Sequence, residues 1–205
     1  MTFGTPQGTG WLEVICGCMF SGKTEELIRR LRRAQIARKR VAIFKPVVDD
    51  RYAPAEIVTH DRISVPSVPV RHPREILELG QDADVLGVDE VQFFDRSVVE
   101  VCQELAGRGI RVIVAGLDTD YRGLPFDPVP ELMAVAEYVT KIQAICVVCG
   151  NPATRTQRVV AGGERILVAG SGAYEARCRR CFRPPEEVSG DLFPRPAGDE
   201  EGKGA

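Results

Sequence analysis

The stretch that decides the fold is residues 11–39, WLEVICGCMFSGKTEELIRRLRRAQIARK. It begins with an apolar run, residues 11–16, which is typical of a buried strand. A turn with two glycines follows, and apolar residues then recur at roughly helical spacing as far as Ile36. The order strand, turn, helix predicts the first unit of an α/β protein.

The turn matches the pattern Gly-x-x-x-x-Gly-Lys-Thr from Gly17 to Thr24. In such a phosphate loop, successive backbone N–H groups converge on phosphate oxygens at the positive end of a helix. Lys23 adds a cation for the terminal phosphates, and Thr24 can ligate Mg²⁺. An ordinary glycine turn is the alternative, but the strand before and the helix after favour a nucleoside triphosphate site. The loop residues expected at ATP are Gly17, Met19, Phe20, Ser21, Gly22, Lys23 and Thr24.

An acidic pair, Asp89-Glu90, follows a second predicted buried strand at residues 84–88. Neighbouring side chains on a strand point to opposite sides, so one carboxylate can face a metal ion while the other faces a nucleophile. We expect Asp89 to hold Mg²⁺ and Glu90 to accept a proton from the group that attacks the γ-phosphate. A substrate hydroxyl and a hydrolytic water both fit, so the pair leaves kinase and ATPase open. The simpler alternative is two solvated residues at a strand end.

The rest of the chain alternates between strand-like and helix-like segments. We expect strands at residues 41–45, 84–88, 111–115 and 138–142, helices at residues 24–39, 73–79, 97–106 and 131–136, and a hairpin within residues 56–65. Apolar strands that alternate with helices imply a parallel sheet covered on both faces, with ligands at the carboxyl ends of the strands. The fold class is therefore α/β, of the P-loop NTPase (RecA-like) type.

Four of the seven cysteines form two Cys-x-x-Cys pairs, Cys146 with Cys149 and Cys178 with Cys181. Four thiolates are typical of a closed structural zinc site, which leaves no position open for catalysis. The spacer between the pairs is longer than the usual roughly 15–20 residues, and its glycines predict a pliable loop. That loop either closes over a ligand or is an ordinary flexible hairpin. The other cysteines, Cys16, Cys18 and Cys102, are expected to be small core residues.

These features predict three parts of the chain. Residues 1–143 form the nucleotide-binding domain, residues 144–188 a zinc-binding lobe, and residues 189–205, rich in Gly, Pro and charge, a disordered tail. Composition agrees, because 44% hydrophobic and 27% charged residues describe an ordinary globular chain.

Charge and hydropathy limit the partners. A formal net charge of -2 gives no general attraction to a nucleic-acid backbone. No apolar run reaches the length of a membrane span, and the first ten residues lack the pattern of a signal peptide. We expect a cytoplasmic protein that binds neither nucleic acid nor membrane. A basic run on the first predicted helix, residues 29–40, is interpreted as its solvated face or a subunit contact, with nucleic acid a third alternative.

Five segments together resemble the thymidine kinases of the zinc-containing, tetrameric type. They are GCMFSGKTEELIRR (17–30), VDEVQFFD (88–95), AGLDTDYRGLPF (115–126), CVVCGNPATRTQR (146–158) and YEARCRRC (174–181). The resemblance covers about residues 11–183, and the combination is far more specific than any single motif.

The resemblance implies a reaction: transfer of the γ-phosphate of ATP to the 5′-hydroxyl of thymidine, with deoxyuridine as a further acceptor, for DNA precursor synthesis by salvage. It implies Glu90 as the base, Asp89 at the metal ion and Arg51 near the reacting phosphate. It also implies feedback inhibition by thymidine triphosphate (dTTP) and a homotetramer. The positions that match the thymine pocket and the lasso loop around the nucleoside are Met19, Phe93, Leu117, Tyr121, Phe126, Thr156 and Tyr174. Core packing is the alternative for the three aromatic residues at 93, 121 and 126.

Two other functions fit part of the pattern. An ATPase or switch protein whose zinc lobe grips DNA or a partner shares the phosphate motifs, but the acidic balance and the aromatic segment 117–126 oppose it. A kinase for another small hydroxyl substrate differs only in the pocket and the lasso. Between Thr156 and Tyr174 the chain matches the family in length and glycine content more than in side chains.

Overall fold

The computed structural model describes residues 8–47, 56–58, 64–160 and 172–185. Within them, six strands form one parallel sheet in the order β5-β2-β6-β7-β1-β8. The strands are β1 (Trp11–Cys16), β2 (Val41–Pro46), β5 (Val68–Val70), β6 (Val85–Val88), β7 (Arg111–Gly116) and β8 (Tyr138–Lys141). The predicted α/β class with a parallel sheet is therefore confirmed.

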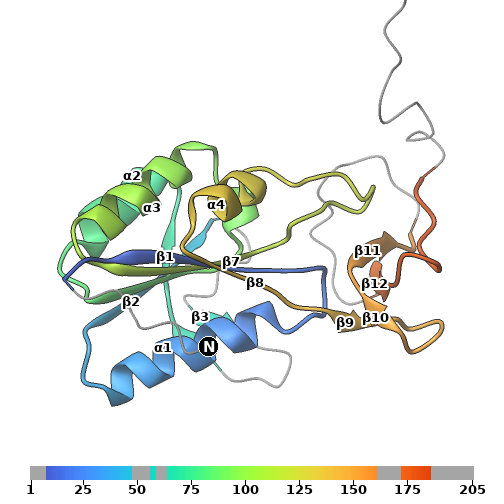
Figure 1. Cartoon of the computed structure of the whole chain (residues 1–205), viewed down its shortest axis with the longest axis horizontal. Coiled ribbons are helices and arrows are strands. Elements are labelled where there is room, and N and C mark those ends of the chain that lie inside the picture. Colours follow the sequence, from blue (N-terminus) through green and yellow to red (C-terminus); the bar gives the residue numbers. More distant parts are fainter. Residues whose placement is uncertain (1–7, 48–55, 59–63, 161–171, 186–205) are drawn as a thin grey trace, which may run out of the picture.

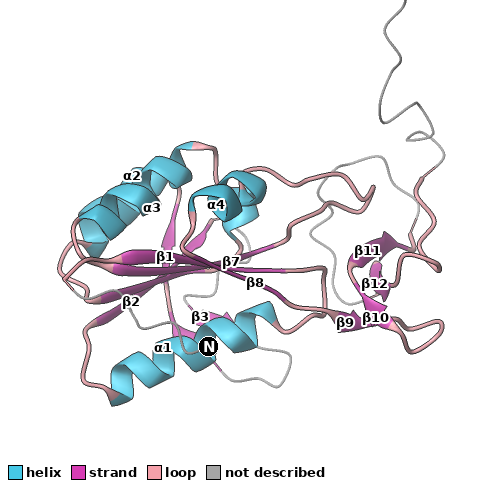
Figure 2. Ribbon diagram, in the orientation of Figure 1, coloured by secondary structure: helices cyan, strands magenta, loops and turns pink. Residues whose placement is uncertain are grey.

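Helices cover both faces of this sheet (Figures 1 and 2). Helix α1 (Lys23–Ile36) lies on one face, and α2 (Pro73–Gly80), α3 (Ser97–Gly107) and α4 (Val129–Val135) lie on the other. None of these helices is both long and apolar enough to cross a membrane.

The two faces of the sheet carry separate hydrophobic cores. Leu27 and Leu31 of α1 pack with Ile15 of β1 and Ile113 of β7, because residues three to four apart share one side of a helix. On the opposite face, alternate residues such as Val14 join the core under α2, α3 and α4. Strands buried on both sides lose the alternation of apolar and polar residues, which explains why they appear in the sequence as continuous apolar runs.

The region between β2 and α2 departs partly from expectation. The predicted hairpin is present, with β3 (Glu56–Val58) antiparallel to β4 (Ser64–Pro66). Strand β5 was not predicted, because it has only three residues and contains Pro69. It pairs with β2 at the edge of the sheet, where a proline is tolerated. The predicted phosphate contact Arg51 lies outside the described residues.

A small lobe lies beyond the carboxyl ends of the central strands (Figure 1). We call residues 144–158 and 172–185 the cysteine lobe. It consists of two antiparallel pairs, β9 (Ala144–Ile145) with β10 (Pro152–Ala153) and β11 (Arg155–Arg158) with β12 (Tyr174–Arg177). The middle of the predicted lasso loop, residues 161–171, and the predicted tail lie outside the described residues.

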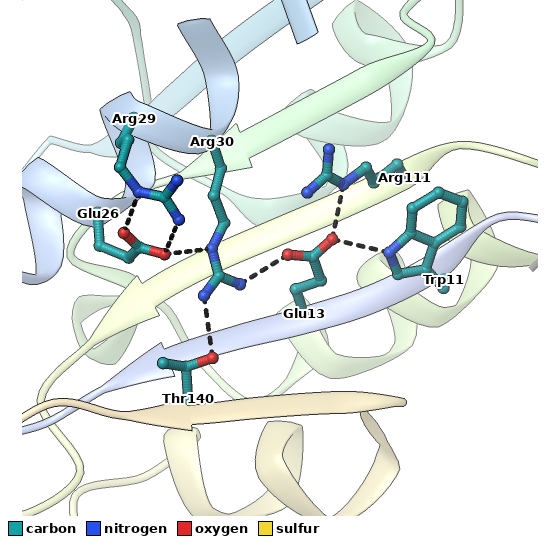
Figure 3. Close-up of polar contacts among 7 residues, drawn as sticks. All are labelled: Trp11, Glu13, Glu26, Arg29, Arg30, Arg111 and Thr140. Carbon is teal, nitrogen blue, oxygen red and sulfur yellow. Dashed lines mark hydrogen bonds and ion pairs between the residues drawn. The ribbon is translucent and has the colours of Figure 1, made fainter. Parts of the chain in front are cut away.

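A charged network is buried between α1 and the sheet (Figure 3). Glu13 of β1, only 6% exposed, accepts hydrogen bonds from Arg30 (2.6 Å), Arg111 (2.6 Å) and the indole of Trp11 (2.8 Å). Arg30 also reaches Glu26 on its own helix. The basic run was interpreted as a solvated face or a subunit contact. Arg30 is an exception to the first interpretation, because it points inward to pair with a buried carboxylate.

The network sets the ionisation of Glu13. Burial raises the pKa of this carboxyl, but the hydrogen bonds from Arg111, Trp11 and Arg30 and the charge of Arg111 together outweigh burial, and the pKa lies below its ordinary value of 4.5. The charged form of Glu13 is therefore favoured by folding, and its contribution to stability is lost as the pH falls.

Replacement of Glu13 by glutamine is expected to lower the free energy of unfolding by about 2–3 kcal/mol at pH 7, because Arg111 loses its carboxylate partner and Arg30 keeps only Glu26. Urea denaturation would measure the loss. The difference from wild type should be complete above pH about 4.5 and shrink as the pH falls below it. Arg29→Ala, at the exposed end of the same network, is the control and should cost less than about 1 kcal/mol. Equal losses in the two variants would contradict this account of the network.

Candidate active site

The phosphate loop connects β1 to α1 at the carboxyl edge of the sheet. Its first residue must be glycine, because Gly17 has a φ of 147° and a Cβ there would lie 2.2 Å from the Ile142 carbonyl oxygen. Ser21 and Lys23 both donate to the Cys18 carbonyl, at 2.8 and 2.9 Å, and these bonds fold the loop on itself. The N-cap of α1 is Gly22, which has no side chain to cap the helix, so the N–H groups of its first turn can serve an anion.

The predicted metal ligands lie together. Asp89, only 5% exposed, follows β6, and the hydroxyl of Thr24 donates to its Oδ2 at 3.1 Å. Burial, and next the charge of Glu90, raise the pKa of Asp89 to about 7. A hydroxyl beside a carboxylate is the oxygen donor set that Mg²⁺ takes next to nucleotide phosphates, so these residues fit that ion.

Glu90 is exposed, and its backbone is left-handed, with φ 52° and ψ 38°. The predicted alternation of side chains along a strand does not extend to Glu90, because β6 ends at Val88. The left-handed turn leads into a short 3-10 helix, η1 (Val91–Phe93), and the Glu90 carbonyl accepts a hydrogen bond from Phe93 N–H at 3.1 Å. A non-glycine residue in this conformation costs roughly 1–2 kcal/mol, so the surrounding contacts hold Glu90 in place.

One of these contacts comes from Gln92, to which the sequence analysis gave no role. Its side chain, 3% exposed, donates from Nε2 to Glu90 Oε2 at 2.5 Å. Its Oε1 accepts a hydrogen bond from Leu117 N–H at 3.1 Å. The side chain thus connects the predicted base to the segment that follows β7.

The segment 117–126 carries three of the residues predicted at the thymine pocket. Phe126 is 8% exposed, and its ring meets the ring of Phe93 edge to face, with centroids 6.3 Å apart. Asp118 is buried at the start of the segment and forms an ion pair with Lys141 at 2.6 Å. The segment is therefore held at both ends against the carboxyl edge of the sheet.

The cysteine lobe touches the phosphate loop directly. Met19 N–H donates to the hydroxyl of Thr156 on β11 at 3.1 Å. The thiol of Cys18 lies 3.3 Å from the Ala153 carbonyl and packs in the small apolar core of the lobe, beside Cys146 and Cys178. Two consecutive residues of the loop are thus anchored to the lobe.

Arg158 is a second residue that sequence reasoning missed. Its guanidinium lies 3.8 Å from the ring centroid of Tyr121 and donates to the hydroxyl of Tyr174 at 2.9 Å. It joins segment 117–126 to both strands that lead to and from residues 161–171. Arg158 ends the segment 146–158 quoted for the resemblance, but nothing in the sequence gave it a role, because its partner Tyr121 is distant in the chain.

The four paired cysteines form one cluster, with their sulfur atoms all within 4.8 Å of one another. Two of the separations are 3.6 and 3.5 Å, close to the roughly 3.8 Å that tetrahedral zinc–thiolate geometry gives. Burial opposes ionisation of Cys146, but backbone N–H groups, that of Cys178 first, lower its pKa to about 6. The donor set therefore fits a structural metal ion.

The remaining cysteines are core residues, as predicted. Cys16, Cys18 and Cys102 are buried and form no disulfide. Burial raises the pKa of Cys16 to about 11 and that of Cys102 to about 12, which leaves both thiols protonated and unreactive at neutral pH.

Comparison with known proteins decides the family. The family model described as thymidine kinase matches residues 10–182. A curated relative from Rhodothermus sp. (strain ITI 518), named thymidine kinase, is 57% identical over 188 residues, which are 92% of this chain and 88% of the relative. The chain belongs to the thymidine kinase family.

Membership of the thymidine kinase family confirms the resemblance found in the sequence. The structure brings most of the predicted residues together in linked groups: Thr24 with Asp89 and Glu90, Met19 with Thr156, and Phe93 with Phe126. Leu117 is bonded to Gln92, which connects it to Glu90, and Arg158 contacts both Tyr121 and Tyr174. Arg51 is the one predicted site residue outside the described part of the chain.

Proposed function

We propose that this member of the thymidine kinase family transfers the γ-phosphate of ATP to the 5′-hydroxyl of thymidine, giving thymidine monophosphate and ADP. The observation that carries the proposal is the position of Glu90. Its exposed carboxylate follows Asp89, the partner of the phosphate-loop residue Thr24, and its side chain is linked through Gln92 to segment 117–126. A base so placed lies between a phosphate donor and an acceptor.

The donor side uses the phosphate loop. Backbone N–H groups of the loop and the first turn of α1 would hold the β- and γ-phosphates, and the Lys23 ammonium would leave the Cys18 carbonyl to reach them. Thr24 and Asp89 would hold Mg²⁺, which neutralises phosphate charge when bound. On this side the protein would promote the reaction by placing the phosphates and neutralising their charge.

The acceptor side uses the aromatic segment and the cysteine lobe. The rings of Phe93 and Phe126, with Met19 and Leu117, provide flat and apolar surfaces suited to a thymine base. Tyr121, Thr156 and Tyr174 would close the pocket from the lobe, where exclusion of water protects ATP from hydrolysis.

The chemical step then needs one proton acceptor. As the 5′-oxygen forms its bond to the γ-phosphorus, the bond from that phosphorus to the bridging oxygen breaks and ADP departs. The proton of the 5′-hydroxyl passes to the Glu90 carboxylate. No covalent intermediate with the protein is required.

Glu90→Gln is expected to lower kcat for thymidine phosphorylation by about 10²–10⁴-fold, because the amide cannot accept the proton. Formation of thymidine monophosphate should be measured on protein whose thermal midpoint shows that it is folded. Glu100→Gln, an exposed change on α3, is the matched control and should retain wild-type activity. Near wild-type turnover by folded Glu90→Gln would exclude Glu90 as the base.

We also propose that the four clustered cysteines hold one structural zinc ion. Elemental analysis should find one zinc per chain in the wild type, and Cys178→Ser should lose it and unfold at a lower temperature. Cys102→Ser changes a buried thiol far from the cluster in sequence and should keep its zinc, whatever its effect on stability. Full zinc content in Cys178→Ser would overturn the assignment.

The resemblance supports further parts of the proposal. They are the role of Arg51 near the reacting phosphate, deoxyuridine as a second acceptor, the homotetramer, feedback inhibition by dTTP, a cytoplasmic location, and the division into residues 1–143, 144–188 and 189–205.

A further inference from the structure

We infer that Gln92 is a positioning residue for the reaction: its amide holds the Glu90 carboxylate in place and fixes it relative to the segment that lines the acceptor pocket. The inference rests on the proposed role of Glu90 as the base. Gln92 itself is 3% exposed and its amide is bonded to Glu90 and to Leu117, so it would act through Glu90.

The hydrogen bonds of Gln92 fix which way its amide points. Leu117 N–H is a donor, so the atom that faces it must be the carbonyl oxygen Oε1. The other end of the amide is then the NH₂ group, and it faces Oε2 of Glu90. A carboxylate can only accept, so both bonds require the same orientation of the amide. Rotation of the amide by 180° would break both bonds.

The Gln92 amide has room because residue 116 beside it is glycine. A Cβ at Gly116, the last residue of β7, would lie 2.8 Å from Gln92 Oε1 and 2.8 Å from a methyl carbon of Val91. Separations under about 3 Å are closer than van der Waals contact allows, so a side chain at this position would displace the amide. Glycine at position 116 and glutamine at position 92 therefore form one local arrangement.

This arrangement matters because, within the part of the chain that the structure describes, Gln92 supplies the hydrogen bond that holds the Glu90 carboxylate. The residue is exposed and follows the end of β6, so its carboxylate could rotate freely in solvent. The bond from Gln92 selects one rotamer of Glu90 before substrate binds. The bond from Leu117 to Gln92 fixes that rotamer relative to the segment proposed to line the acceptor pocket. A displacement of about 1 Å in a reacting group can reduce turnover by about 10²-fold.

Two replacements of Gln92 distinguish the effect of its bond to Glu90 from that of its bond to Leu117. Gln92→Glu keeps the shape and the acceptor for Leu117 N–H but replaces the amide donor to Glu90 with a carboxyl group, which repels Glu90 when ionised and otherwise shares one proton with it, so that Glu90 cannot accept freely. Gln92→Met keeps approximate length and loses both bonds. We expect both to lower kcat per folded molecule by about 10–100-fold with the KM for ATP within about threefold of wild type. Only Gln92→Met should also raise the KM for thymidine, since it alone frees Leu117.

A role in stability alone would give a different pattern. Loss of folded protein lowers the amount of active enzyme, so kcat must be referred to the folded fraction, measured by thermal denaturation and titration of nucleotide binding. Gln103→Glu, an exposed change on α3, controls for the added charge and should leave kcat unchanged. If kcat per folded molecule stays within twofold of wild type in both Gln92 variants, the inference is wrong.

The double variant Glu90→Gln with Gln92→Met tests whether the two residues act as one unit. Its kcat should equal that of Glu90→Gln alone, because Gln92 has no base left to position. A further fall of 10-fold or more would show that Gln92 acts independently and would overturn the inference. An inactive Glu90→Gln beside fully active Gln92 variants overturns only the inference, whereas an active Glu90→Gln overturns the proposed base and the inference with it.

Discussion

The arrangement of the site depends on the anchoring of the phosphate loop to the cysteine lobe. Met19 N–H is bonded to Thr156, and Cys18 packs in the lobe's core beside two of the four clustered cysteines. Two residues of the phosphate loop, Cys18 and Met19, thus contact the lobe in which the four cysteines cluster. The loop is therefore one wall of a larger site, and the proposed zinc ion would stabilise the lobe that this wall contacts.

The opposite wall is built at the ends of β6 and β7, two neighbouring strands of the parallel sheet. The chain leaves β6 in a left-handed turn at Glu90, and Gln92 then connects that turn to Leu117, just after β7. Arg158 completes a ring of contacts, because it connects Tyr121 of segment 117–126 to Tyr174 of the lobe. The proposed donor, base and acceptor surfaces are thus parts of one ring of contacts around the carboxyl edge of the sheet, which is where ligands bind in open α/β folds.

The parts of this structure that sequence predicts are those encoded locally. The phosphate loop, the long apolar strands and the Cys-x-x-Cys pairs each depend on residues close together in the sequence. The structure confirms the strands, the strand–loop–helix order and the clustering of the four cysteines. Strand β5 was missed because three residues with a central proline carry no strand signal of their own, and only pairing with β2 creates the strand. The inward turn of Arg30, and the roles of Gln92 and Arg158, depend on partners far away in the chain, and no periodicity or spacing could reveal them. The backbone of Glu90 was misjudged because strand alternation was extended past the end of β6.

The central claim is that the phosphate loop and the acceptor pocket work together in transfer of phosphate to a nucleoside. Its most direct test is a single-turnover reaction with ATP labelled on the γ-phosphate, followed for both nucleoside monophosphate and inorganic phosphate, with each of the four common deoxynucleosides or DNA as the added component. The account predicts that label appears in thymidine monophosphate, that ATP is consumed only when an acceptor is present, and that thymidine is the preferred acceptor. Release of labelled inorganic phosphate without nucleoside, or release stimulated by DNA, would contradict it.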